Sequence, residues 1–304
     1  MKQDGARRDS AAPAARVLVV YKRSTYQRLV RDQRNARIQE LIQAGDPLVD
    51  EIIAAHEAHL ITIDRTRALL RSMGVKALFR HRAETHNMQA CDLVVSIGGD
   101  GTLLWASHLV GPQTPMLAIN SAPKASVGYF CAGDQDALPD LLRDALAGRL
   151  PALSLSRMQV WRDGEPLSTR VLNDALFCHL CPAVTARYHI GVDALAEEQK
   201  SSGLWIGPPA GATAALRSAG GQPMLIDGDA LQYLVREPYT SAAAPYRHTG
   251  GFIHPGHALV VRSKMDDGRL YLDGAHRSHP VELGAELHFS RSAEALTLLG
   301  FIGW

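Results

Sequence analysis

The sequence predicts two domains: an α/β domain with a parallel, Rossmann-like sheet, followed by a mostly antiparallel all-β domain. Three observations predict this order. Short apolar runs alternate with helical periodicity as far as about residue 140, and two-residue alternation dominates from there to residue 291. The length of 304 residues suits two domains of about 150 residues each. We therefore expect a disordered leader over 1–15, the α/β domain over 16–140 and the β domain over 141–291.

Buried strands of the first domain are expected at four short apolar runs, namely Arg16–Tyr21, Val75–Phe79, Cys91–Ile97 and Met116–Ile119. Between Tyr26 and Met73, apolar residues recur at three- and four-residue steps, with a break at Gly45-Asp46-Pro47. This spacing predicts helices. Further helices are expected from Thr102 to about Leu109 and from Leu138 to Leu150. Strands that alternate with helices predict a parallel sheet covered on both faces.

Period-two segments predict the strands of the second domain, at Gln159–Arg162, Val171–Asn173, Tyr188–Val192, Leu231–Val235, Ala258–Arg262 and Leu270–Asp273. Turn signals separate them at Asp163-Gly164, Asp267-Gly268 and Asp273-Gly274. The segment Ala295–Phe301 is apolar enough to form a last strand.

The balance of positive and negative charges excludes a protein whose overall electrostatic field attracts nucleic acids or anionic membranes. The chain has 32 Lys+Arg against 31 Asp+Glu, a formal net charge of +1, so we expect neither a nucleic-acid nor a membrane partner. The one basic stretch of the first domain, Arg80-His-Arg82, is expected to be a solvated strand end. Four cysteines make no disulfide framework, and the N-terminus resembles no signal peptide, so a cytoplasmic location is expected.

The run Ser96-Ile-Gly-Gly-Asp-Gly-Thr-Leu-Leu104 predicts a phosphate-binding loop between a buried strand and a helix. Its glycines let the backbone approach an anion without Cβ clashes, and the N–H groups of a helix start hold phosphate. The carboxylate of Asp100 would repel phosphate unless it serves chemistry or a magnesium ion. The alternative is an ordinary glycine turn with a helix-capping aspartate.

Gly98-Gly99-Asp100-Gly101-Thr102 matches the phosphate loop of the superfamily that contains NAD kinases and diacylglycerol kinases. From about residue 17 to 300 the chain resembles NAD kinases, and especially the divergent branch that includes the animal mitochondrial enzyme. The segments that carry this resemblance are Lys22-Arg-Ser-Thr-Tyr26, Asn120-Ser-Ala-Pro-Lys-Ala-Ser-Val-Gly128, Leu172-Asn173-Asp174, Gly211-Ala-Thr213 and Val235-Arg-Glu-Pro238.

The resemblance implies transfer of the γ-phosphoryl group of ATP to the adenosine 2′-hydroxyl of NAD or NADH, which gives NADP(H). Asp100 would accept the hydroxyl proton, while Mg²⁺ carried by ATP bridges the phosphates. The residues implied to hold ATP phosphates are Gly98, Gly99, Gly101 and Thr102. Those implied to bind NAD(H) are Asn120, Ser126, Asn173, Asp174, Gly211 and Thr213. Protein metal ligands are not predicted, since Cys178-His-Leu-Cys181 has no second cysteine pair.

The resemblance also implies that the tail, residues 292–304, returns to the first domain and that the active site lies in the cleft between domains. A homodimer or higher homo-oligomer is implied as well, with the helical insert 26–73 as a candidate surface. His56 and His59 share a face of that insert and are expected at a surface or interface.

The sequence departs from the family around the acceptor. Asp174 replaces a glutamate, so its carboxylate reaches about 1 Å less far. In Pro208-Pro-Ala-Gly-Ala-Thr213, residues 208, 210 and Ala212 lack hydroxyls that relatives carry, and Ala215 replaces an aromatic residue. Two other functions stay open: a lipid or sphingoid-base kinase of the same superfamily, and a catalytically weak NAD(H)-binding sensor. Preference for NAD or NADH, and for ATP or polyphosphate as donor, is also open.

Overall fold

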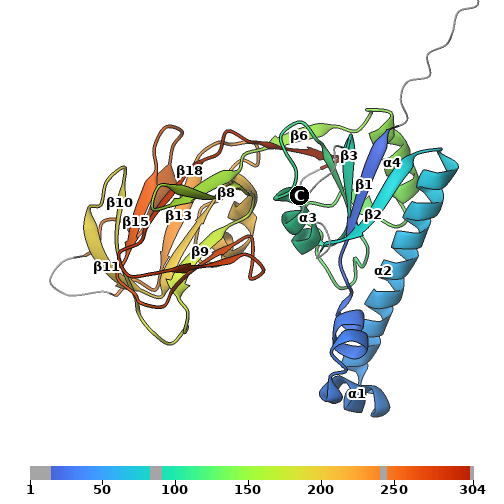
Figure 1. The fold of residues 1–304 in the computed structure, drawn as a ribbon, viewed down its shortest axis with the longest axis horizontal. Helices are drawn as coiled ribbons and strands as arrows, with labels where there is room; N and C mark the ends of the chain where they lie inside the picture. Colours follow the sequence, from blue (N-terminus) through green and yellow to red (C-terminus); the bar gives the residue numbers. More distant parts are fainter. Residues whose placement is uncertain (1–14, 83–90, 240–244, 302–304) are drawn as a thin grey trace, which may run out of the picture.

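The apolar runs of the first domain form neighbouring strands of one sheet (Figure 1). The computed structural model describes residues 15–82, 91–239 and 245–301, so the expected leader lies outside it except for Ala15. The sheet has the order β2-β1-β3-β4-β19-β6, with β5 beside β4. Its strands are β1 (Arg16–Tyr21), β2 (Lys76–His81), β3 (Leu93–Gly98), β4 (Met116–Asn120), β5 (Gly133–Asp134), β6 (Ala152–Leu155) and β19 (Leu296–Leu299). All pairs are parallel except β19 with β6, as the alternation of strands and helices predicts.

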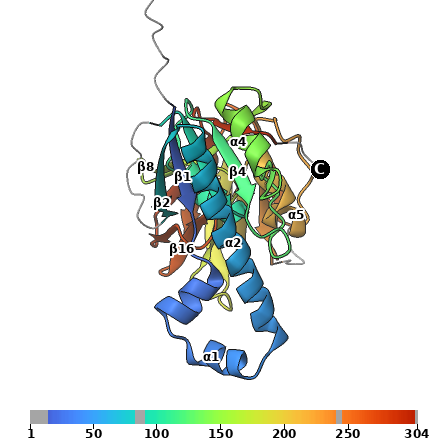
Figure 2. The same ribbon diagram turned by 90° about the vertical axis from the view of Figure 1, so that its right-hand side faces the viewer.

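The insert between β1 and β2 is helical and breaks where the sequence predicts. It contains the π-helical turn η1 (Gln27–Asp32), α1 (Ala36–Gln43) and α2 (Pro47–Ser72). The Asp46 side chain caps α2 by accepting from the N–H of Leu48 at 2.9 Å, and α2 stops before Gly74, whose φ is +70°. Figure 2 shows α1 at the far end of α2, away from the sheet.

Two apolar clusters cover the two faces of this sheet. Alternate residues of β1 divide between them: Val17 and Val19 pack with α2 and α4 (Leu138–Leu146), whereas Leu18 and Val20 pack with α3 (Asp100–Ser107). Helix α4 ends four residues earlier than the sequence predicts, because the chain turns at Gly148 with φ +65°. Among the described residues, no helix is long and apolar enough to cross a membrane.

The second domain is a sandwich of two antiparallel six-stranded sheets. One sheet, in the order β11-β10-β15-β18-β7-β8, contains Glu197–Ser201, Ala186–Val192, Leu259–Ser263, Glu286–Arg291, Met158–Arg162 and Glu165–Val171. The other, in the order β14-β13-β12-β9-β16-β17, contains Gly250–Ile253, Leu231–Arg236, Gly203–Gly207, Ala175–His179, Gly268–Leu272 and Ser278–Val281. A single apolar core fills the space between them. The short helices η3 (Pro209–Thr213) and α5 (Ala215–Ser218) follow β12.

Two details of the β domain correct the sequence prediction. β8 ends at Val171, so Leu172 and Asn173, expected in a strand, form the turn that follows it. Gly268 begins β16. Both residues of Asp163-Gly164 and of Asp273-Gly274 have positive φ; the first pair forms the tight turn between β7 and β8, and the second pair begins the longer turn between β16 and β17.

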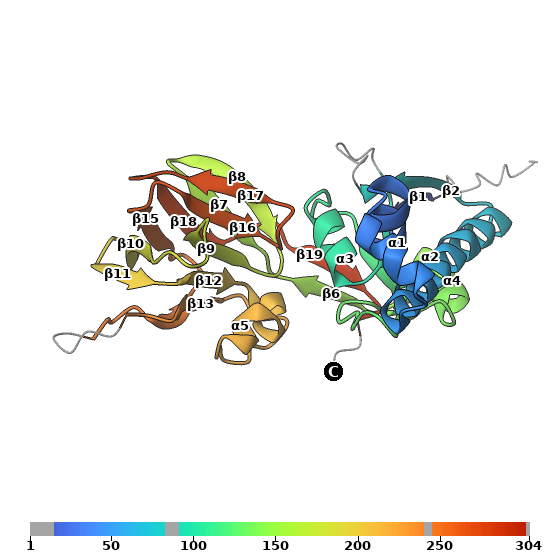
Figure 3. The ribbon, with the colours of Figure 1, turned by 90° about the horizontal axis from the view of Figure 1, so that it is seen from below.

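The chain passes between the domains through two strands that lie side by side (Figure 3). β6 belongs to the first sheet although it lies beyond the boundary expected near residue 140, and β19 brings the tail back beside β4. Figure 3 shows both segments running between the sandwich and the α/β domain.

A buried guanidinium joins these crossing segments to α3. The side chain of Arg157 is fully buried, and it donates to the carbonyl oxygens of Ser107 (3.0 Å), Val110 (3.0 Å), Glu294 (2.7 Å) and Ala295 (3.0 Å). Burial lowers the pKa of Arg157 to about 10, so it stays cationic at neutral pH. The four carbonyls satisfy a charge that would otherwise be costly to bury.

Replacing Arg157 tests this joint. We expect Arg157→Met to lower the free energy of unfolding by about 3 kcal/mol or more, because buried carbonyls lose their donors. Arg143→Met is the control, since Arg143 forms an exposed ion pair with Asp140, and such pairs contribute about 0.5 kcal/mol or less. Urea unfolding measures both variants, and equal losses would contradict the assignment.

Candidate active site

The predicted phosphate loop lies at the carboxyl end of β3, where the chain turns into α3. Gly98 and Gly99 are required by packing: a Cβ on Gly98 would collide with the Thr102 side chain, and one on Gly99 with the Ser126 hydroxyl. A Cβ on Gly101 would meet no atom within 4 Å. Gly101 therefore faces open space, which leaves its backbone accessible to a ligand.

The Asp100 carboxylate is held by two backbone donors. The N–H of Tyr129 donates to one oxygen at 3.0 Å, and that of Phe130 donates to the other at 2.9 Å. Asp100 is also the first residue of α3, where the helix dipole favours a negative charge. The carboxylate is thus fixed in direction, and each oxygen retains a lone pair for a further donor.

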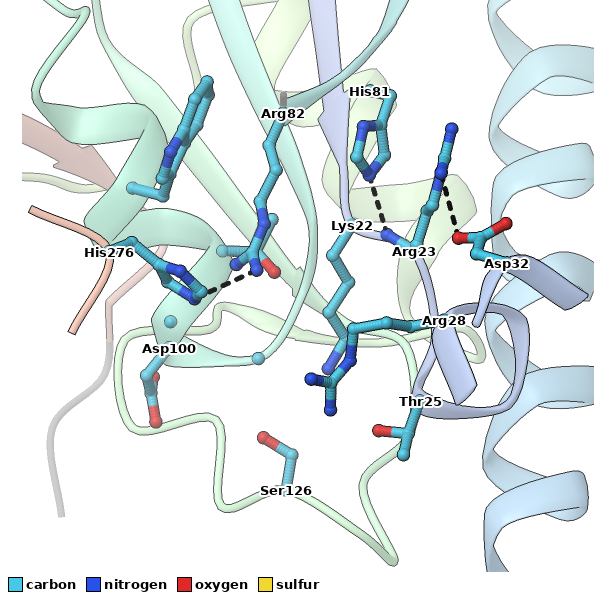
Figure 4. A pocket seen from close by; sticks show the side chains of 14 residues that line it. Lys22, Arg23, Thr25, Arg28, Asp32, His81, Arg82, Asp100, Ser126 and His276 are labelled. Carbon is cyan, nitrogen blue, oxygen red and sulfur yellow. Dashed lines mark hydrogen bonds and ion pairs between the residues drawn. The ribbon is translucent and has the colours of Figure 1, made fainter. Parts of the chain in front are cut away.

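A cavity of about 730 Å³ opens beside this loop (Figure 4). It takes in Gly99, Asp100, Gly101, Thr102 and Ser126, together with four basic side chains: Lys22, Arg23, Arg28 and Arg82. The lining carboxylates are Asp32 and Asp100, and His81 and His276 add imidazoles. Arg82, expected to be solvated, therefore lines a cavity in which cations outnumber carboxylates, which suits an anionic ligand.

One polar atom at the loop lacks a partner. Thr102 Oγ1 is buried and has no hydrogen-bond partner among the residues that the structure describes. Thr102 lines the same cavity as Asp100. Buried hydroxyls are nearly always satisfied, so this one can complete its bonding with a ligand.

The segment after β4 places Ser126 beside the loop by means of Asn120. The Asn120 amide donates to the Ser126 carbonyl at 2.9 Å, and its oxygen accepts from the N–H of Ala122 at 3.2 Å. Gly128, with φ +66°, lies so close that a Cβ would collide with this amide. The side chain of Asn120 thus holds the loop 120–128, and Ser126 is the residue of this segment that lines the cavity.

Asn173 and Asp174 lie in a turn organised by the buried carboxylate of Asp273. Asp273 accepts from the N–H groups of Leu172 (2.9 Å), Asn173 (2.6 Å) and Asp174 (3.1 Å) and from His108 Nε2 (2.7 Å). The Asn173 amide donates to Asp174 at 2.7 Å. Burial, together with the negative charge of Asp273, raises the pKa of Asp174 to about 7.

The remaining acceptor candidates divide between buried and exposed positions. Gly211 lies against the carbonyl of Asn173, where a Cβ would collide, while Thr213 is exposed. Ala210 packs in the same apolar cluster as Leu103 and Leu172, and Ala212 is 1% exposed. The described lining of the 730 Å³ cavity contains none of Asn173, Asp174, Gly211 and Thr213, which form a second group on the β domain.

Several residues that shape the site carry no motif. His56 and His59, expected at a surface, are buried: His56 bonds to the Ser24 hydroxyl at 2.9 Å, and His59 to the Ser121 hydroxyl and the Lys22 carbonyl, both at 2.8 Å. Burial lowers the pKa of His59 to about 4, so its ring is neutral and acts as a spacer between two loops. The three-residue spacing of the histidines predicts their shared face but not what covers it.

Comparison with known proteins finds similar chains among NAD and NADH kinases. The family model described as ATP-NAD kinase N-terminal domain matches residues 23–150. A protein of Oryza sativa subsp. japonica named "Probable NADH kinase" is 33% identical over 263 residues, which are 79% of this chain and 81% of that protein. NADH kinase of Arabidopsis thaliana is 32% identical over 240 residues, 70% and 74% of the two chains.

Two solved structures share the fold. An NAD kinase from Archaeoglobus fulgidus in complex with ATP has a TM-score of 0.65 at 17% identity, over 93% of this chain and 92% of that one. Yeast NADH kinase complexed with NADH has a TM-score of 0.66 at 16% identity, over 94% and 83%. The resemblance to the animal mitochondrial branch stays a prediction. The identity and coverage of the plant relatives, together with the glycine loop and the two-domain fold, show that this chain belongs to the NAD kinase family.

Proposed function

We propose that this protein transfers the γ-phosphoryl group of ATP to the adenosine 2′-hydroxyl of NAD or NADH. The main observation behind this proposal is the Asp100 carboxylate, which two backbone N–H groups hold in place. It lines a cavity rich in cations and lies next to Gly101, whose backbone is accessible. Membership of a family whose named relatives include NAD and NADH kinases supports the choice of substrates.

The reaction needs positioning and charge neutralisation more than covalent chemistry. In this proposal the backbone N–H groups of Gly99 and Gly101, after the turn at Gly98, hold the terminal phosphates at the start of α3. Asp100 accepts the proton of the 2′-hydroxyl as the oxygen attacks phosphorus, and ADP leaves with the electron pair of the broken P–O bond. The hydroxyl of Thr102 donates to a phosphate oxygen.

Magnesium fits this donor set. Among the described residues, no group of three or more His, Cys, Asp or Glu side chains could hold a metal ion by itself. A single carboxylate with neighbouring hydroxyls suits an ion that binds chiefly to phosphate oxygens and water, as Mg²⁺ does. Bound with ATP, the ion would neutralise the charge that develops on the phosphate oxygens.

For the acceptor, we assign adenosine contacts to Asn173, Asp174, Gly211 and Thr213, with Ser126 between the acceptor and the phosphate loop. Asn120 would act by holding Ser126. Ala210 and Ala212 lack the hydroxyls that relatives carry, but both residues are buried and contribute to packing. Their substitution is therefore compatible with this assignment. We also propose a cytoplasmic homo-oligomer whose domains follow the expected ranges, near 16–140 plus the tail and 141–291, except that β6 belongs to the first domain.

The first test is a product assay with Mg-ATP and either NAD or NADH. We expect Asp100→Asn to lower kcat at least about a hundredfold, the scale of a general base, while NAD(H) binding is retained. Product formed equally by both proteins would remove the base role from Asp100. A folded protein that binds NAD(H) without turnover would favour the sensor, and one that binds neither dinucleotide would favour a lipid acceptor.

Alanine variants of Gly101 and Gly99 distinguish access of the ligand to the backbone from packing of the loop. We expect Gly101→Ala to keep the melting temperature and to raise the KM for ATP at least about tenfold, since its methyl group occupies the approach to the backbone. Gly99→Ala should instead lower the melting temperature, because its Cβ collides with Ser126. Unchanged ATP kinetics in Gly101→Ala would contradict phosphate binding at this loop.

Acceptor binding should depend on pH through Asp174. Its pKa of about 7 leaves the carboxyl group neutral below pH 7 and ionised above it, and only the ionised group accepts two hydroxyl donors. We expect the KM for NAD(H) to fall about fivefold to tenfold between pH 6 and pH 8 in the wild type. Asp174→Asn should abolish this dependence, and a slope that persists in the variant would assign it to another group.

A further inference from the structure

Three cations in the cavity beside the phosphate loop come from separate segments of the chain. Lys22 follows β1, Arg28 lies in η1, and Arg82 follows β2. Figure 4 shows Lys22 and Arg28 extending into the space bordered by Asp100, Thr25 and Ser126, with Arg82 entering from the other side. They therefore face one space although the chain separates them.

These three cations differ from their neighbour Arg23 in having no acidic partner. Arg23 forms an ion pair with Asp32 at 2.9 Å. Within the ranges that the structure describes, no carboxylate lies within 4.0 Å of the charged nitrogens of Lys22, Arg28 or Arg82. Arg82 donates instead to Nε2 of His276, from the β domain, at 3.1 Å.

The cations also act against each other electrostatically. The pKa of Lys22 is lowered by burial and by the charge of Arg82, and that of Arg82 by burial and by Arg28. Burial, Arg82 and Arg28 lower the pKa of His276, which favours the neutral ring that accepts the hydrogen bond from Arg82. A cluster of like charges without counter-ions is unfavourable until a multivalent anion enters it.

We propose that Lys22, Arg28 and Arg82 bind the phosphate chain of the donor, a linear polyphosphate carried by a nucleoside triphosphate or free in solution. This proposal rests on the proposed function and assigns the phosphate chain of the donor to the three cations. The terminal phosphate occupies the glycine loop, and the preceding phosphates lie among the cations. The two guanidinium groups suit this ligand because each can donate two parallel hydrogen bonds to phosphate oxygens. His276 is a positioning residue, since it holds Arg82 toward the cavity across the domain boundary.

Direct binding without an acceptor tests the assignment. The probe is sodium tripolyphosphate, titrated calorimetrically into the full chain and its variants at two salt concentrations. We expect Arg28→Gln and Arg82→Gln each to weaken binding at least about tenfold and to reduce the salt dependence. Arg80→Gln is the matched control, because Arg80 is an exposed arginine two residues away that does not line the cavity. It should bind tripolyphosphate as the wild type does.

Steady-state kinetics then separates donor from acceptor. The two cavity variants should raise the KM for ATP and leave that for NAD(H) unchanged, and turnover with tripolyphosphate in place of ATP would identify the free chain as a donor. Equal tripolyphosphate affinity in the wild type, Arg80→Gln and Arg82→Gln would overturn the inference. So would a raised KM for NAD(H) alone, because the cations would then serve the acceptor's diphosphate. Tripolyphosphate binding that depends on Arg82 in a protein without NAD(H) kinase activity would support this subsite and refute the proposed function.

Discussion

The geometry of the site depends on one buried carboxylate. Asp273 is 1% exposed at its side chain and receives hydrogen bonds from three consecutive backbone N–H groups and from one imidazole. Such a charge is tolerated inside a protein only when its donors are in place. Because the imidazole belongs to His108, the residue after α3, the helix that begins at the phosphate loop is fixed to the turn of Asn173 and Asp174.

The same carboxylate sets the chemistry of its neighbour. Burial of Asp174 and the negative charge of Asp273 both oppose ionisation of Asp174, so the carboxylate that holds the turn contributes to the pKa of Asp174 near neutrality. Asp273 therefore contributes both to the position of the turn and to the protonation of Asp174. Asp100, by contrast, is held by backbone N–H groups and belongs to the cation-lined cavity, so the two aspartates lie in different surroundings.

The sequence predicts what local pattern determines. Apolar runs identify β1, β3 and β4, and Gly45-Asp46-Pro47 identifies the helix break, because burial and capping act within a few residues. The glycine spacing predicts the turn from β3 into α3 for the same reason. The roles of Arg157 and Asp273 could not be predicted in this way. Arg157 is a lone arginine before a strand, and Asp273 belongs to an ordinary turn signal. The sequence predicts Arg82 in solvent, because only the assembled fold shows that other strand ends and the β domain enclose it. Roles that depend on partners far along the chain leave no local signal.

The position of β19 has a consequence for how this protein is made. The α/β sheet takes in β6 and β19, and β19 supplies its parallel partner for β4 from the far end of the chain. The whole sandwich lies between those two segments in sequence, and its pairings are confined to that stretch. During synthesis from the N-terminus, the sandwich emerges complete while the first sheet still lacks a strand. The β domain can therefore fold first, and the first sheet, which carries the glycine loop, is complete only when β19 has left the ribosome.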